Sequence, residues 1–164
     1  MRNYTFKETQ KFNQLWIWML LIFVTGITVY SSFYLSPSDT SFGLEKLIPF
    51  GIISLVILLF ISLKLETRID SDSLVFSYFP LIRKRKYDFN KIESMEFIVY
   101  NSLWEYGGWG IRINFDSWSY NTGGKFGIMV KTKDKKFLIG THKPEEAKKA
   151  IALFDAFKSK NHGS

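Results

Sequence analysis

Two long stretches without a charged residue constrain this chain more than any other feature. No Asp, Glu, Lys, Arg or His occurs from Phe12 to Ser38, or from Leu47 to Leu63. A helix rises about 1.5 Å per residue and the hydrocarbon core of a bilayer is about 30 Å thick, so about 20 apolar residues are enough to cross it. We therefore predict two transmembrane helices, at about residues 15–35 and 44–65, joined as an antiparallel hairpin by a short, turn-rich loop.

Basic residues gather at the two outer ends of this predicted hairpin. They are Arg2, Lys7, Lys11, Lys64 and Arg68. By the positive-inside rule, the N-terminal segment (residues 1–14) and everything after residue 65 are expected in the cytoplasm, with the protein in the cell (inner) membrane as a multi-pass protein. A cleaved signal peptide is disfavoured because bulky Phe33 and Tyr34 lie where a cleavage site needs small residues. A buried hairpin of a soluble protein is the remaining alternative.

The pattern changes after residue 65 from continuously apolar to alternating, which is typical of half-buried strands. Seven short strands are predicted, at residues 65–69, 74–79, 87–89, 95–100, 109–115, 126–132 and 136–141. A helix is predicted from about Pro144 to Lys158, because apolar residues recur there at spacings of three and four. This predicts one β-rich domain over residues 66–158, followed by a polar tail at residues 159–164.

The order of these elements resembles that of bacterial membrane-anchored pleckstrin-homology-like (PH-like) domain proteins, in which a transmembrane hairpin leads directly into a PH-like domain. The likeness covers nearly the whole chain, and its most specific local matches are residues 107–112 and 139–146. The resemblance implies an α+β membrane protein, in which a two-helix transmembrane hairpin is followed by a seven-stranded antiparallel PH-like barrel with a C-terminal capping helix. It implies no particular ligand, because such folds serve many binding tasks.

The densest charge cluster is the basic run at residues 83–86. It comprises Arg83, Lys84, Arg85 and Lys86, with Lys91 close behind. A basic residue close to an anionic leaflet contributes about 1 kcal/mol of attraction, so the run could bind anionic phospholipid headgroups. The competing interpretations are a solvated strand or turn, and contact with another acidic partner.

An aromatic stretch beside glycines is the second candidate site. Trp104 and Tyr106 lie next to Gly107 and Gly108, where the backbone has unusual freedom. They either insert into a membrane or partner, or fill the core beneath a bulge. Arg112 alternates with apolar neighbours and should face away from the core, where it binds a phosphate or, as we favour, pairs with an acidic neighbour.

Several classes of chemistry find no support. The chain has no cysteine, which excludes disulfides and thiolate metal sites, and His142 is the only histidine within the predicted domain. We expect no cofactor, no metal and no enzymatic activity. Nucleic-acid binding is disfavoured because the basic residues are mixed with acidic ones.

The sequence therefore predicts a noncatalytic membrane-tethered PH-like binding module. Its expected partners are the lipid bilayer, with anionic phospholipid headgroups, a peptide or a membrane protein recognised at the inner face. The alternative is a scaffold or assembly subunit of a larger membrane complex, with Gly26 of the first helix at a helix contact and an exposed strand that accepts a partner's strand.

Overall fold

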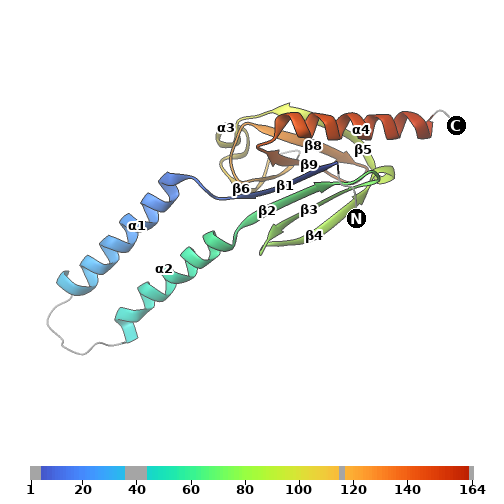
Figure 1. Ribbon diagram of the computed structural model, residues 1–164. Coiled ribbons are helices and arrows are strands. Elements are labelled where there is room, and N and C mark those ends of the chain that lie inside the picture. The colour runs from blue at the N-terminus through green and yellow to red at the C-terminus, as the bar shows by residue number, and fades with distance from the viewer. Residues whose placement is uncertain (1–4, 36–43, 115–116, 163–164) are drawn as a thin grey trace. The chain divides into compact units, whose positions relative to one another are not determined.

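The computed structural model describes residues 5–35, 44–114 and 117–162 (Figure 1). The chain divides into two compact units. The helical unit is the continuous segment Phe12–Leu63, and the β-rich unit combines Met1–Lys11 with Lys64–Ser164. The apolar segment is thus an insertion between two parts of one domain.

The helical unit contains α1 (Leu15–Tyr30), which continues as a short π-helical turn, η1 (Ser31–Leu35), and α2 (Leu44–Ser62). Among the described residues, only the helix Leu15–Tyr34 is long and apolar enough to cross a membrane, whereas the apolar part of α2, Leu47–Ser62, is shorter. The prediction of two transmembrane helices is therefore wrong. The second helix was predicted to reach residue 65, but it ends at Ser62 and the chain enters a strand at Lys64.

The first sheet of the β-rich unit has four antiparallel strands in the order β1-β2-β3-β4. They are β1 (Phe6–Lys11), β2 (Lys64–Ile69), β3 (Ser73–Phe79) and β4 (Ile82–Asp88). The predicted hairpin of β2 and β3 is confirmed, whereas β1 was not predicted. Lys11 lies directly opposite Lys64, so the chain leaves the sheet and returns to it at the same end of one strand pair.

The second sheet has five strands in the order β5-β8-β9-β7-β6. They are β5 (Ile92–Val99), β6 (Gly110–Ile113), β7 (Trp118–Asn121), β8 (Phe126–Thr132) and β9 (Lys136–Thr141). A 3₁₀ turn, η2 (Phe89–Lys91), precedes β5, and a short helix, α3 (Ser102–Tyr106), follows it. Strands β7 and β9 are parallel, unlike every other neighbouring pair.

The two sheets pack face to face through aromatic side chains. The ring of Phe76 on β3 lies 4.9 Å from that of Tyr120 on β7 and 5.4 Å from that of Phe137 on β9, measured between centroids. The buried hydroxyl of Tyr78 donates a hydrogen bond to the carbonyl of Asn121, at 3.1 Å. Fully buried aromatic rings therefore form the centre of the core.

The predicted C-terminal helix is present as α4 (Pro144–His162) and lies along the β-rich unit in Figure 1. Its apolar stripe is buried, and Phe154 packs edge-on against Phe89 of η2 at 5.1 Å. The helix also contacts β5, β8 and β1, and so covers elements of both sheets.

The prediction of a seven-stranded antiparallel PH-like barrel with a capping helix is wrong. The described residues form nine strands in two separate sheets, with no closed barrel, and one strand pair is parallel. The strand predicted at residues 87–89 overlaps only the end of β4 (Ile82–Asp88). Two further strands, β1 and β7, were missed. Each is short, and the alternation of its side chains is easily mistaken for an ordinary polar segment.

Candidate functional site

The outer face of the four-stranded sheet carries a row of basic side chains. Because side chains alternate between the two faces of a strand, cross-strand partners share a face. Lys7 on β1 is opposite Arg68 on β2, Arg68 is opposite Val75 on β3, and Val75 is opposite Lys86 on β4. Three basic residues from distant parts of the sequence thus meet in one row, which we call the basic row.

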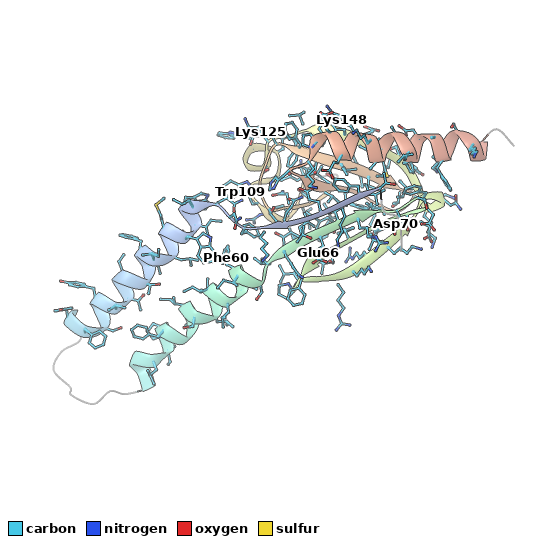
Figure 2. The ribbon with its side chains drawn as sticks, viewed as in Figure 1. Phe60, Glu66, Asp70, Trp109, Lys125 and Lys148 are labelled. Carbon is cyan, nitrogen blue, oxygen red and sulfur yellow. The ribbon has the colours of Figure 1, made fainter. Side chains whose placement is uncertain are left out.

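A concave region of about 480 Å³ lies beside this row, near the turn between β2 and β3. Its lining combines basic, acidic and hydroxyl side chains: Arg68, Asp70, Ser71, Asp72, Ser73, Val75, Lys84 and Lys86. Figure 2 labels Glu66 within β2 and Asp70 just after its end. The volume falls within the range typical of small-ligand sites, about 300–1,000 Å³.

Ion pairs organise the charges of this concave region. The Nε of Arg68 donates to Oδ1 of Asp70 at 2.7 Å, and the Nζ of Lys86 lies 2.9 Å from Oδ1 of Asp88. The hydrogen bond from Lys86 lowers the pKa of the exposed Asp88 carboxyl, and the charge of Lys86 acts in the same direction. The site therefore offers donors and acceptors together, as a hydroxylated phosphate group requires.

The basic run at residues 83–86 is strand β4 itself, at the edge of the sheet. Lys84 and Lys86 line the concave region, whereas Arg85 is opposite Phe76, whose ring faces the core. Arg85 donates a hydrogen bond to the hydroxyl of Tyr120; burial raises the pKa of Tyr120, and Arg85 partly opposes that shift. Arg85 therefore has a structural partner on β7 of the second sheet.

The remaining predicted basic residues lie at opposite ends of β4. Arg83 is exposed beside the turn that joins β3 to β4. Lys91 is exposed at the end of η2, and the N–H of Phe89 at the start of η2 donates to the carbonyl of Asp72. Lys91 therefore lies near the β2–β3 turn, at the other end of the sheet from Arg83.

The two aromatic residues of the second predicted site differ in their exposure. Trp104 on α3 is 88% exposed. Tyr106 is buried, packs edge-on against Tyr100 and shares a 3.0 Å hydrogen bond with Ser117. These contacts favour a packing role for Tyr106 and leave Trp104 as the accessible aromatic residue of α3.

Arg112 is exposed on β6 and folds back over the glycine-rich loop. Its Nε donates to the carbonyl of Trp109 at 3.2 Å, and its guanidinium lies against Gly108, which has a φ of +133°. Trp109 is labelled in Figure 2. Arg112 is thus placed away from the basic row, on the other sheet.

The basic row contains two residues that the sequence did not single out as site residues. Lys7 belongs to a strand that was not predicted, and Arg68 was treated only as a flanking charge. The signal for β1 was present but weak, because Phe6, Glu8 and Gln10 are all buried while their neighbours are exposed. Two of these buried residues are polar, so the strand does not stand out as apolar alternation.

The helical unit differs from a soluble helix pair in what it exposes. Only Ile17 of α1 is buried, and large apolar side chains lie on all sides of the helix. The hydroxyls of Thr25 and Thr28 donate to the carbonyls of Leu21 and Val24, at 2.7 and 2.9 Å. These two hydroxyls are therefore satisfied without water, as a lipid environment demands.

Within the described part of the chain, no group of three or more His, Asp or Glu side chains is placed to hold a metal ion. No protein-family model matches the chain, and no curated protein matches it.

Proposed function

We propose that this protein is a noncatalytic, membrane-tethered binding module that recognises anionic phospholipid headgroups at the inner face of the cell membrane. The insertion Phe12–Leu63 supplies the tether, and the concave region beside the basic row supplies the binding surface. The observation that carries the proposal is the combination of the two in one chain: an exposed apolar insertion begins and ends on the sheet that bears the basic row.

The tether is supported by length, exposure and hydrogen bonding. The helix Leu15–Tyr34 meets the length requirement for crossing a membrane. A water-exposed apolar surface of this extent is unfavourable, because each Å² of apolar surface left in water costs about 25 cal/mol. Since Lys11 and Lys64 are paired, the insertion starts and finishes on one side, which keeps both parts of the β-rich unit together.

The cytoplasmic location of the β-rich unit is part of the proposal. It is supported by the basic residues at the two ends of the insertion, Lys7 and Lys11 before it and Lys64 and Arg68 after it. Basic residues that flank a membrane segment favour the cytoplasmic side.

The headgroup preference is supported by the chemistry of the concave region. Lys84, Lys86 and Arg68 provide cationic donors for a phosphate, while Asp70, Asp72 and the serines can accept hydrogen bonds from hydroxyl groups. Phosphatidylglycerol offers both kinds of group. A neighbouring hollow that shares Arg68, Val75 and Lys84 has a volume of only about 200 Å³, so the hollow of about 480 Å³ is the better fit for a headgroup.

Native mass spectrometry of the full-length protein in mild detergent tests this proposal. With added phosphatidylglycerol, we expect the unchanged protein to retain bound lipid, and Lys84→Gln/Lys86→Gln to retain several-fold less. The matched control is Lys133→Gln/Lys135→Gln, which removes the same charge from the exposed β8–β9 turn. Equal retention by both double variants, or equal retention of phosphatidylcholine, would contradict the proposal.

A second candidate function, assembly with another membrane protein, is favoured by one specific observation. An apolar groove of about 630 Å³ in the helical unit is lined by residues of α1, by Tyr34 of η1 and by Ile57 of α2, and Gly26 of α1 opens onto free space. Small residues allow close approach of another apolar helix. Crosslinking in native membranes tests this function: Gly26→Leu should reduce a specific crosslink, whereas recovery of the unchanged protein as an uncrosslinked monomer would count against it.

A further inference from the structure

The turn between β3 and β4 exposes two large apolar side chains. Phe79, the last residue of β3, is 53% exposed, and Leu81 in the two-residue turn after it is 59% exposed. Turns in soluble domains usually carry polar residues or glycine. Phe79, Pro80 and Leu81 therefore form an apolar tip at the end of the β3–β4 hairpin.

Strand register places this tip at the end of the sheet where the tether is attached. Phe79 is opposite Lys64, and Lys64 is opposite Lys11. Lys11 and Lys64 are the residues immediately before and after the insertion Phe12–Leu63. Three neighbouring strands thus present the two attachment points and the apolar tip at one end.

Basic side chains surround the apolar tip. The Nζ of Lys64 lies 5.8 Å from the centroid of the Phe79 ring and 2.9 Å from Oε1 of Glu66. Lys11 is exposed at the end of β1, and Arg83 is exposed two residues after Leu81. Apolar side chains that enter the headgroup region, with long basic side chains beside them, are the pattern of a surface that lies in a membrane interface.

We propose that the apolar tip is a second membrane contact, in which Phe79 and Leu81 enter the interfacial region of the bilayer and Lys11, Lys64 and Arg83 bind lipid phosphates. This inference rests on the proposed tether, because the tether brings this end of the sheet to the membrane surface. The contact holds the β-rich unit in one orientation. It also gives Arg83 a role separate from that of Lys86. Lys86 lies about 10 Å further along β4, at a rise of about 3.3 Å per residue.

Site-specific labelling of the full-length protein tests the inference, because the chain has no cysteine of its own. The protein is placed in nanodiscs of phosphatidylglycerol and phosphatidylcholine, and Phe79→Cys or Leu81→Cys is labelled with an environment-sensitive fluorophore. The matched control is Leu153→Cys on α4, where the native side chain is 51% exposed. Leu153 adjoins Phe154, which packs on Phe89 near the β2–β3 turn at the opposite end of the sheet.

We expect blue-shifted emission at positions 79 and 81, with several-fold stronger quenching by spin-labelled lipid than at position 153. Quenching at both tip positions should decrease in nanodiscs of phosphatidylcholine alone. That lipid has no net negative charge, so it attracts the basic residues beside the tip less strongly. If labels at 79 and 81 behave like the label at 153 while the protein stays in the nanodisc, the inference is wrong and the tether proposal stands. If the protein separates from the nanodiscs, both are wrong.

Discussion

At the scale of single residues, side chains of β1 connect the first residues of the chain to its last strand. The carboxylate of Glu8 accepts a hydrogen bond from the hydroxyl of Thr141 at 2.6 Å and another from the N–H of His142 at 2.8 Å. The amide of Gln10 donates to the carbonyl of Gly140 at 2.7 Å and accepts from Thr122 at 2.9 Å. All these bonds are buried or partly buried, so they fix β1 to the second sheet as well as to β2.

Removal of the Glu8 carboxylate should destabilise the protein. Glu8→Ala leaves the Thr141 hydroxyl and the His142 N–H without their acceptor, which should lower the free energy of unfolding by about 2 kcal/mol. Denaturant unfolding in detergent, followed by near-ultraviolet circular dichroism, measures the change. The control is Thr9→Ala, whose side chain on the same strand is exposed, and which should cost less than half as much. Equal losses would show that the Glu8 contacts contribute nothing specific.

Tyr100 occupies a space that two glycines leave open. Gly127 on β8 is directly opposite Gly140 on β9. A side chain at Gly127 would collide with Leu138 and come within 3.1 Å of the Tyr100 ring, and one at Gly140 would come within 3.1 Å of its hydroxyl. Burial raises the pKa of Tyr100 to about 12, and burial also raises the pKa values of Tyr78 and Tyr120.

These pKa shifts predict a loss of stability at alkaline pH. Below about pH 10, tyrosine is protonated in both the folded and the unfolded state, so the full stability is present. Above that pH the unfolded state releases protons that the folded state still holds, so unfolding becomes easier as the pH rises towards the folded pKa of Tyr100. The melting temperature should therefore fall as the pH rises from about 10 towards about 12.

Tyr100→Phe should make this alkaline decrease shallower, because it removes one of the shifted groups. At neutral pH its effect should stay within about 1 kcal/mol, since the hydroxyl is buried and the ring is kept. A profile for Tyr100→Phe that overlays that of the unchanged protein would refute the assignment.

At the scale of elements, the insertion Phe12–Leu63 interrupts a β-hairpin. Strands β1 and β2 pair along their whole length, from Phe6 opposite Ile69 to Lys11 opposite Lys64. The two strands are separated in the sequence by the apolar insertion, yet they end side by side as if a tight turn joined them. A domain boundary placed at residue 66 would therefore divide one sheet.

Replacement of residues 12–63 by Asn-Gly should give a protein that folds without detergent. Asn-Gly favours the tight turn that closes a two-residue hairpin, and Lys11 and Lys64 are already opposite each other. By contrast, a fragment that starts at residue 66 lacks β1 and all its buried hydrogen bonds. We expect cooperative unfolding of the hairpin-closed protein and a lower melting temperature or aggregation of the fragment. Equal melting temperatures would show that β1 is dispensable.

At the scale of the whole molecule, the chain combines a helical unit with an apolar exterior and a β-rich unit with its own core. In the helical unit, Ile17 is the one buried side chain of α1, whereas the β-rich unit buries complete aromatic rings. Different solvents suit these two surfaces. The proposed function follows from this difference, with lipid around the first unit and water around most of the second.

The proposed orientation can be tested with one cysteine on the β-rich unit. Leu153→Cys, in the otherwise cysteine-free full-length chain, places a thiol on the exposed side of α4. In intact cells a membrane-impermeant maleimide should leave it unlabelled, and labelling should appear after the membrane is permeabilised. Labelling in intact cells would place the β-rich unit outside. Recovery of the protein in the soluble fraction without detergent would contradict the tether itself.

Local patterns in the sequence were sufficient to predict several helices and strands. The apolar run of α1, the β2–β3 hairpin around its polar turn and the apolar stripe of α4 were all predicted close to their observed positions. Each is recognisable within one segment, because the period of its side chains reflects an interface that lies along that segment. The basic run was also predicted as a cluster, although Arg85 proved to face Tyr120.

Tertiary structure decided what depends on partners far away in the sequence. The side-chain period indicates that a segment is a strand, but it does not show which strand lies next to it. It therefore could not predict the pairing of β1 with β2, the parallel pairing of β7 with β9 or the separation into two sheets. In the sequence, Glu8 and Gln10 resemble solvent-exposed polar residues. In the folded protein they form hydrogen bonds with Thr141 and Thr122, which are distant in the sequence. The sequence by itself determined that the first helix is long and apolar enough to cross a membrane, while packing between distant segments determined the sheets and the basic row.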